Sequence, residues 1–254
     1  MSFDYCGHLS QEDTQFTLKR TFADTRLALS HAMEYARTVA IPVHVVGACY
    51  GLIPLLFVLE EFGWPRDVKS LFSIGGLFSM HEIINFDGYN PYLKKRGLTF
   101  KSKDDLMGFM IAEKDTFVRD KQKYIEALTE YLQQVFTELE DVISYERFGV
   151  MTYSNVDFYQ TFYEFLTIDL PEISVPHYFP CLFFTGAHDT VLDLKTPKGE
   201  EEYTQRIMAL ASHAKFFKLR IDHFGRGADH YVIGREGVKF LIASEVASAL
   251  DKCL

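Results

Sequence analysis

Apolar residues along this chain follow two spacings, one typical of helices and the other of strands. In the first half, apolar residues from Thr17 to Val39 recur at roughly helical spacing, and Pro42 ends that predicted helix. A β-branched run begins at Val43, and it leads into a further apolar helix. We therefore expect a strand, a helix, a strand, a helix and a strand, namely Ser2–Tyr5, Thr17–Val39, a strand from Val43, Leu52–Phe62 and Val68–Ile74.

The last part of the chain repeats this alternation. After His177 come a strand pattern, a helix pattern, a strand pattern and a final helix pattern, namely Cys181–Thr185, Lys198–His213, Phe216–Ile221 and Glu236–Leu250. Strands that alternate with helices in this way pair in parallel, and the helices cover the faces of the sheet. The predicted fold class is therefore α/β with a mostly parallel sheet.

An insertion of about a hundred residues separates the strand ending near Ile74 from the strand near Cys181, far more than an ordinary connection needs. We expect residues 81–176 to form a helical cap. Residues 1–80 and 177–254 would then form the core of the protein.

Inside the insertion, apolar residues from Tyr124 to Ile143 recur at i, i+3 and i+4, which predicts a strongly amphipathic helix. A stretch dense in aromatic residues follows, and it includes Phe148, Phe158, Tyr159 and Phe162. Packed aromatic rings dominate small cores, so these rings could form the insertion's own core. The alternative is that some of them line an apolar substrate pocket beneath the cap.

Composition narrows the class of protein. The chain has 254 residues, of which 48% are hydrophobic and 24% charged, enough for one large domain or a domain with a cap. The net charge of -9 argues against nucleic-acid binding, because phosphate contacts need a concentrated Lys and Arg surface. The four cysteines show neither metal-site spacing nor a disulfide framework. We therefore expect reduced thiols, a cytoplasmic protein, and no metal or other cofactor.

One uncharged run, Ile41 to Leu59, is nearly as long as a membrane span. The run is interrupted by prolines and glycines, at Pro42, Gly47, Gly51 and Pro54, and it begins with β-branched residues. A strand followed by a buried helix is therefore the better interpretation. The N-terminus also lacks the basic start and apolar centre of a signal peptide, so we expect neither a membrane span nor export.

The most informative segment is the strand that begins at Val43 and runs into Gly47-Ala48-Cys49-Tyr50-Gly51 and then an apolar helix. In such a strand–turn–helix elbow, small residues allow strand and helix to approach closely, while the middle residue is strained and presents its side chain. The middle residue here is Cys49. A thiol at the start of a helix is favoured as the thiolate, which is its nucleophilic form.

Three further segments accompany the elbow. Gly186-Ala187-His188-Asp189-Thr190-Val191 follows an apolar strand, and Gly227-Ala228-Asp229-His230-Tyr231 lies between the last strand and the last helix. Phe3-Asp4-Tyr5-Cys6-Gly7-His8 begins within the first predicted strand and extends past its end. Together with the elbow, these segments resemble an α/β-hydrolase in type, order and spacing. Outside the insertion, the resemblance covers the whole chain.

The resemblance implies a Cys-His-Asp triad. Cys49 would attack an acyl carbonyl, His230 would take the thiol proton, and Asp189 would orient the imidazole. The backbone N–H of Tyr50 would donate one hydrogen bond to the oxyanion. His223 is the rival histidine, and His230 is preferred because its surroundings resemble the family's Gly-x-Gly-His-aromatic run.

Two functions from different classes follow. The first is a cysteine-dependent acyl enzyme that hydrolyses, or transfers the acyl group of, a small ester or thioester with an apolar acyl group, free or held on a carrier. The second is a non-catalytic or partner-completed domain that binds a small ligand or a protein. If Ser2–Tyr5 is the family strand that precedes the first helix pair, we expect the earlier strands, and the loop that gives a second oxyanion donor, to be missing. An uncovered strand edge tends to pair, so we expect a homodimer or completion by another chain.

Overall fold

The computed structural model describes the chain with gaps. Described are residues 18–78, 86–120, 122–124, 126–127, 130–131, 173–189, 192, 194, 196–219, 243–244 and 246–248. The chain divides into two compact units, and each is described here by itself. The first draws on Phe22–Phe78 and Leu170–Leu254, and the second on Ser2–Thr21 and Ser79–Asp169.

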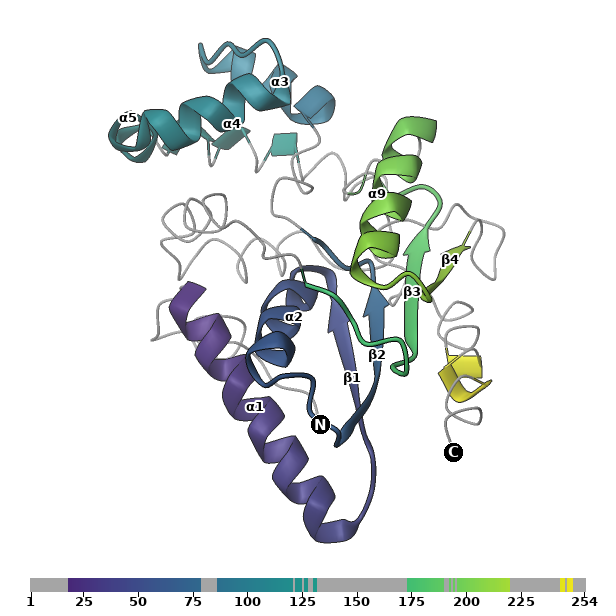
Figure 1. The fold of residues 1–254 in the computed structure, drawn as a ribbon. Helices are drawn as coiled ribbons and strands as arrows, with labels where there is room; N and C mark the ends of the chain where they lie inside the picture. The colour runs from purple at the N-terminus through teal and green to yellow at the C-terminus, as the bar shows by residue number, and fades with distance from the viewer. Residues whose placement is uncertain are drawn as a thin grey trace. The chain divides into compact units, whose positions relative to one another are not determined.

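The first unit holds the sheet and most of the first helix. Its elements are α1 (Leu18–Val39), β1 (Val43–Ala48), a 3₁₀ turn η1 (Cys49–Gly51), α2 (Leu52–Glu61), β2 (Val68–Ile74), β3 (Cys181–Gly186), α9 (Pro197–Leu210) and β4 (Lys215–Leu219) (Figure 1). The predicted strand over Val68–Ile74 is confirmed, as is the helix that ends at Val39. The strand expected at Ser2–Tyr5 lies outside the described residues.

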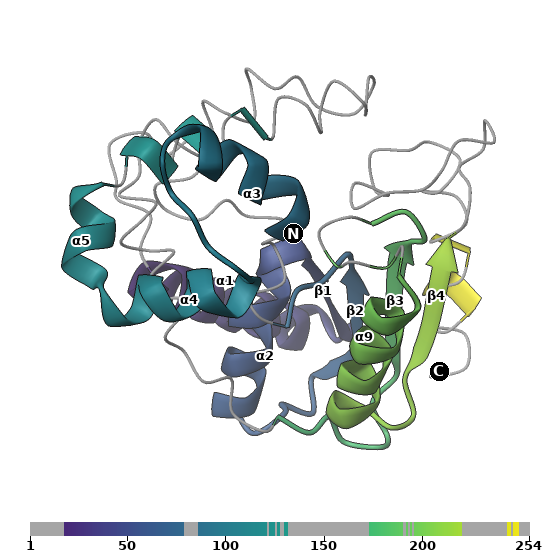
Figure 2. The ribbon, with the colours of Figure 1, turned by 90° about the horizontal axis from the view of Figure 1, so that it is seen from above.

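The described strands form one parallel sheet in the order β1-β2-β3-β4. The predicted α/β class with a mostly parallel sheet is therefore confirmed. Helix α2 connects β1 to β2 and α9 connects β3 to β4, so right-handed crossovers place both helices on the same face. Figure 2, seen from above, shows α2 and α9 on one side of the strands.

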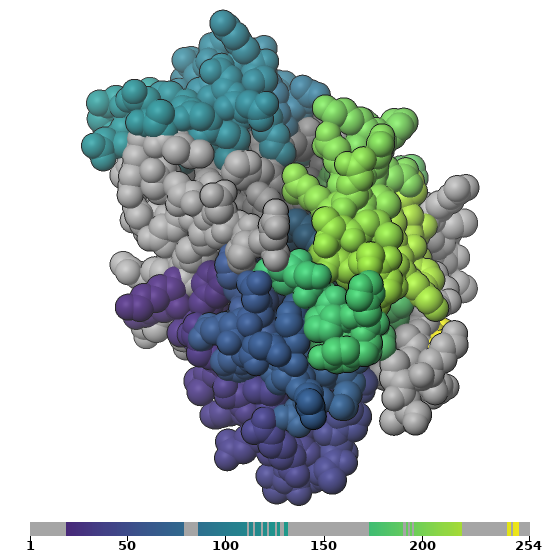
Figure 3. All heavy atoms as spheres, in the orientation of Figure 1, coloured from purple at the N-terminus to yellow at the C-terminus, as the bar shows by residue number. Residues whose placement is uncertain are grey.

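Helix α2 is apolar around most of its circumference because it is covered on two sides. Seven of its residues are buried, namely Leu52, Ile53, Pro54, Leu55, Leu56, Val58 and Leu59. Helix α1 packs against it, with the rings of Phe22 and Phe57 edge to face at 5.1 Å and Arg26 paired with Glu61. In Figure 3 the purple atoms of α1 lie against the blue atoms of α2. The uncharged run from Ile41 to Leu59 is therefore a strand and a buried helix, as predicted.

The opposite face of the sheet carries its own apolar cluster. Phe72, Leu182, Phe184 and Leu219 form its buried centre, and Ile74, Phe217 and Val246 pack around it. Val246 belongs to the stretch predicted as the last helix, and the described residues from 243 to 248 are helical. Strands β2, β3 and β4 are therefore packed on both faces, as buried parallel strands are.

Helix α9 ends earlier than predicted. Its N-terminus is capped by Thr196, whose hydroxyl accepts a hydrogen bond from the backbone N–H of Gly199. At the other end, Ala211 adopts an extended conformation (φ -150, ψ 94), and the chain turns into β4. The predicted helical end at His213 is therefore wrong, because the helical spacing of apolar residues continues past the residue at which the backbone leaves the helix.

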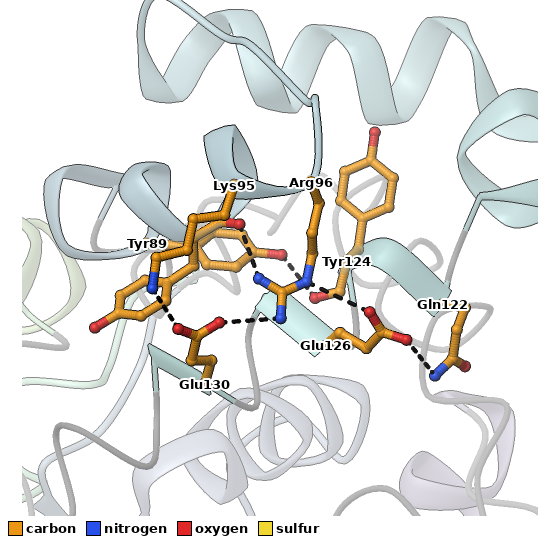
Figure 4. A network of polar contacts seen from close by, with 8 residues as sticks. Tyr89, Lys95, Arg96, Gln122, Tyr124, Glu126 and Glu130 are labelled. Carbon is orange, nitrogen blue, oxygen red and sulfur yellow. Dashed lines mark hydrogen bonds and ion pairs between the residues drawn. The ribbon is translucent and has the colours of Figure 1, made fainter.

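The elements that the structure describes in the second unit are helices. It contains α3 (Phe86–Lys95), α4 (Lys103–Ala112) and α5 (Lys114–Arg119), and the described residues between 122 and 131 are helical as well. A polar network fastens this last stretch to α3 (Figure 4). Glu130 pairs with Lys95 and Arg96, and the hydroxyl of Tyr89 donates to the carbonyl of Tyr124. The amphipathic helix predicted from Tyr124 to Ile143 is therefore helical over its described residues.

Candidate functional site

The turn after β1 has the strained backbone expected of an elbow. Cys49 has a φ of 49°, which lies in the left-handed region that non-glycine residues rarely adopt. It follows Ala48, which is still extended, and it opens the 3₁₀ turn that leads into α2. Strain of this kind persists only where the surrounding structure holds it, and it is concentrated at functional sites. Cys49 is half-buried at the carboxyl end of its strand.

Gly47 permits the close approach of strand and helix. A Cβ added at Gly47 would lie 2.8 Å from the Cα of Leu52, closer than real Cβ atoms come to backbone. Gly76, in the loop after β2, is confined in the same way by Ser73 and Leu52. Gly51 differs, because its backbone is ordinary right-handed helix (φ -60, ψ -15). The tight packing expected at the elbow is therefore seen at Gly47, while the backbone at Gly51 does not require glycine.

The loop after β2 holds the elbow from a second side. The backbone N–H of Leu77 donates to the carbonyl oxygen of Cys49 at 3.1 Å. Gly75 donates to the carbonyl of Phe184 on β3 at 2.7 Å, and the Tyr203 hydroxyl of α9 donates to the carbonyl of Gly76 at 2.8 Å. Three neighbouring elements thus fix this loop. Its contact with Cys49 restrains the elbow backbone where the strain lies.

Asp189 is a fully buried carboxylate just after β3, with an exposed fraction of 0%. One carboxylate oxygen accepts the backbone N–H of Leu192 at 2.9 Å, and the other accepts the hydroxyl of Thr185 at 3.1 Å. The backbone of Asp189 is tied into the same turn, because its N–H donates to Gly186 and its carbonyl accepts from Leu194. Buried charges are tolerated where hydrogen bonds satisfy them, and this turn is arranged around the carboxylate.

Cys49 and Asp189 follow strands of the same sheet at the same edge. Ala48 is aligned with Ile74 of β2, and Ile74 with Phe184 of β3, so the chain leaves β1 and β3 at matching ends. Neighbouring strands lie about 4.8 Å apart, which puts the ends of β1 and β3 about 10 Å apart across β2. An imidazole placed between the two side chains would bridge such a gap. In parallel α/β sheets, ligands bind outside this carboxyl edge.

Several predicted site residues lie outside the described residues. These are both candidate histidines, His223 and His230, and the four candidate pocket residues Phe148, Phe158, Tyr159 and Phe162. Strand β4 ends at Leu219, at the edge that β3 leaves as well, and both histidines follow it in sequence. Tyr50 is described and is half-buried in the 3₁₀ turn. The complete triad and the pocket therefore stay predictions.

The sequence argument did not single out Thr185 or Tyr203. Nothing in the sequence distinguishes Thr185 from the apolar residues before it in β3, because a β-branched residue is ordinary in a strand. Tyr203 fits the helical spacing of the apolar residues in α9, so the sequence gives it no separate role. A signal did exist for the loop, since Gly75-Gly76 directly after a strand marks a turn. Their hydrogen bonds, from Thr185 to Asp189 and from Tyr203 to Gly76, gave these residues their roles.

The described helices were also searched for membrane spans and metal sites. None of the helices described is long and apolar enough to cross a membrane. Within the same described ranges, no three His, Cys, Asp or Glu side chains gather as metal ligands would.

Comparison with known proteins gives only distant likenesses. No family model matches the chain, and no curated protein matches it in sequence. Among solved structures, an esterase from Exiguobacterium antarcticum has a TM-score of 0.49 at 15% identity, covering 97% of this chain and 79% of the esterase. BpoC from Mycobacterium tuberculosis H37Rv, provisionally classed as a non-heme bromoperoxidase, has a TM-score of 0.47 at 16% identity, covering 98% and 81%. Likenesses this distant transfer no residue role to this chain.

Proposed function

We propose that this protein is an acyl enzyme of α/β-hydrolase type that uses Cys49 as its nucleophile. The observation that carries the proposal is the backbone of Cys49, held in the left-handed region between a parallel strand and a buried helix. A structural cysteine has no need of that strain, whereas a nucleophile presented at the end of a strand does. The buried and hydrogen-bonded Asp189 after β3 supports the same proposal.

The proposed reaction has two halves. His230 takes the thiol proton, and the Cys49 sulfur bonds to the carbonyl carbon of an ester or thioester, whose π electrons move to oxygen. The tetrahedral intermediate then collapses, and the leaving alkoxide or thiolate takes the proton from His230. In the second half, His230 takes a proton from water, and the hydroxide attacks the acyl group. The acid departs, and the Cys49 sulfur takes the proton back from His230, which restores the thiol. Another acceptor in place of water would make the reaction an acyl transfer.

Asp189 and Tyr50 would support this chemistry without changing covalently. The carboxylate of Asp189 would orient the imidazole and stabilise its charged form. The backbone N–H of Tyr50 would donate to the oxyanion of the intermediate, a contact whose loss typically costs about two to three orders of magnitude in rate. The second oxyanion donor is not assigned to a residue.

The proposed substrate is a small ester or thioester with an apolar acyl group, free or held on a carrier. Thioesters suit a cysteine enzyme because exchange onto a second thiol is nearly isoenergetic. If the aromatic residues Phe148, Phe158, Tyr159 and Phe162 line the pocket, activity should rise with acyl length, since each buried methylene contributes about 0.8 kcal/mol.

A partner-completed or non-catalytic domain is the second candidate. Among the described strands, β1 lies at one edge of the sheet, and Val46 on it is 58% exposed. An apolar strand at an edge favours pairing, either with a second copy or with another chain. Light scattering coupled to size-exclusion chromatography would show the dimer, and a monomer with full esterase activity would rule against completion.

The proposal is tested by trapping the acyl-enzyme. Incubation with octanoyl thioester followed by peptide mass spectrometry should find an octanoyl adduct on Cys49. The Cys49→Ala variant should show no adduct and should lose turnover at least about 10⁴-fold, as loss of a triad nucleophile does. The matched control, Cys181→Ala, should keep both. Turnover by folded Cys49→Ala protein at the wild-type rate would overturn the proposal and favour the binding domain.

A further inference from the structure

A second buried polar side chain stands beside the carboxylate of Asp189. Thr185 is the penultimate residue of β3, has an exposed fraction of 0%, and donates its hydroxyl to the carboxylate at 3.1 Å. The residues before it in β3, from Cys181 to Phe184, are all buried and apolar. Valine has nearly the shape of threonine and would suit such a position. The hydroxyl is therefore the feature that needs an explanation.

Burying a hydroxyl costs free energy unless it is hydrogen-bonded. The hydroxyl of Thr185 makes that bond to Asp189, four residues further along the chain, across the turn. Each carboxylate oxygen then has one described donor, the Thr185 hydroxyl on one and the Leu192 backbone N–H on the other. Two donors from opposite sides fix the plane of the carboxylate.

We infer that Thr185 is a positioning residue, which holds the carboxylate of Asp189 in the orientation needed to act on the catalytic histidine. The inference rests on the proposed function, in which Asp189 orients His230. It adds a residue outside the triad, whose effect on the reaction passes entirely through the carboxylate.

Other charged groups near this turn are accounted for among the described residues. Lys218 of β4 is aligned with Thr185, and it pairs with Glu200 of α9. His188, next to Asp189 in the chain, is exposed. On the β2 side, the residue aligned with Phe184 of β3 is the uncharged Ile74. Among the described contacts of the carboxylate, the two hydrogen bonds from Thr185 and Leu192 fix its orientation.

The test compares Thr185→Val, which loses the hydroxyl, with Thr185→Ser, which keeps it. The first readout is the ¹³C chemical shift of the Asp189 carboxyl at neutral pH, assigned with Asp189→Asn. Thr185→Val should move this chemical shift, because the carboxylate loses a hydrogen-bond donor. Thr185→Ser should keep it close to the wild-type value. This readout needs no enzymatic activity, so it tests the hydrogen bond even if the proposed function fails.

The second readout is the split between kcat and KM with an octanoyl ester. Thr185→Val should lower kcat about tenfold with little change in KM, because a misoriented carboxylate weakens its action on the histidine and leaves substrate binding intact. Thr185→Ser should keep kcat close to the wild-type value. Ser70→Ala is the matched control, because it removes a buried hydroxyl that bonds His44 on the neighbouring strands. It should lower stability without lowering kcat.

The outcomes separate the two claims. A wild-type Asp189 chemical shift in Thr185→Val overturns the inference, whatever the enzyme does. A moved chemical shift with a wild-type kcat, in an enzyme that depends on Cys49, also overturns it, because the orientation of Asp189 would then not matter to the reaction. A moved chemical shift in a protein with no Cys49-dependent activity overturns the proposed function and, with it, the catalytic part of the inference.

Discussion

The two cysteines that the structure describes stand at opposite ends of parallel strands in one sheet, and their surroundings differ in every respect that governs reactivity. Cys49 follows the carboxyl end of β1, is half-buried, and has a left-handed backbone. Cys181 opens β3 at the amino end, is 2% exposed, and has an ordinary strand backbone. Burial raises the pKa of the Cys181 thiol to about 12. Both residues are cysteines, so residue type does not separate the candidate nucleophile from the core residue. The end of the strand at which each lies, and its backbone conformation, do separate them.

The largest expected difference is in alkylation. At pH 8 a thiol with a pKa of about 12 is about 10⁻⁴ thiolate, and burial excludes the reagent as well. Iodoacetamide should therefore label Cys49 at least about 10³-fold faster than Cys181 in folded protein, measured by peptide-resolved mass spectrometry over time. In about 6 M guanidinium, which unfolds the protein, the two labelling rates should converge. Equal rates in the folded protein would remove the distinction on which the nucleophile assignment depends.

A smaller effect is expected when the glycine at the elbow is replaced. The replacement tests whether the close approach of β1 and α2 requires glycine at this position. Gly47→Ala should destabilise the protein by about 2 kcal/mol, because the new Cβ would overlap the Leu52 backbone. Gly108→Ala, at an exposed helical position with open space around it, should stabilise the protein by roughly 0.5 to 1 kcal/mol. Urea unfolding measures both. A neutral Gly47→Ala would mean that strand and helix separate at little cost.

The smallest expected effect is the pH dependence that Cys181 gives to folding. Its pKa is about 12 in the folded protein against 9.0 for the ordinary thiol, so above pH 9 the unfolded chain loses a proton that the folded chain keeps. The free energy of unfolding should therefore fall as pH rises, by about 1 kcal/mol between pH 9 and pH 10 from this thiol alone. Cys181→Ala should remove that part of the slope. An unchanged slope in the variant would place the high pKa in doubt.

Sequence reasoning recovered the elements of the sheet because apolar periodicity reports them directly. The strand over Val68–Ile74 has the predicted bounds, and the uncharged run before it divides into β1 and α2 as expected. The spacing of the elbow also anticipated the strained backbone of Cys49, since a strand entering a helix within three residues leaves little conformational choice. Local sequence patterns thus predict local backbone conformation.

The contacts that hold the candidate site could not be predicted in the same way. The hydrogen bond from Leu77 to Cys49 joins residues from different elements, and the one from Tyr203 to Gly76 joins residues far apart in sequence. No periodicity marks such pairs, because they depend on register and on which face each side chain occupies. The end of α9 was misplaced for a related reason, since apolar spacing continues beyond Leu210 although the backbone turns there.

Strand β2 contributes no proposed catalytic residue, yet it sits between the two strands that do. It therefore acts as a fixed-width spacer whose backbone sets the gap between the nucleophile and the acid. The width of β2 is set by its extended, hydrogen-bonded backbone and hardly at all by its side chains. The side chains of β2 can therefore change to suit the packing while the nucleophile and the acid keep their spacing. A strand inserted or lost at this place would separate or crowd the reactive groups without changing any of them.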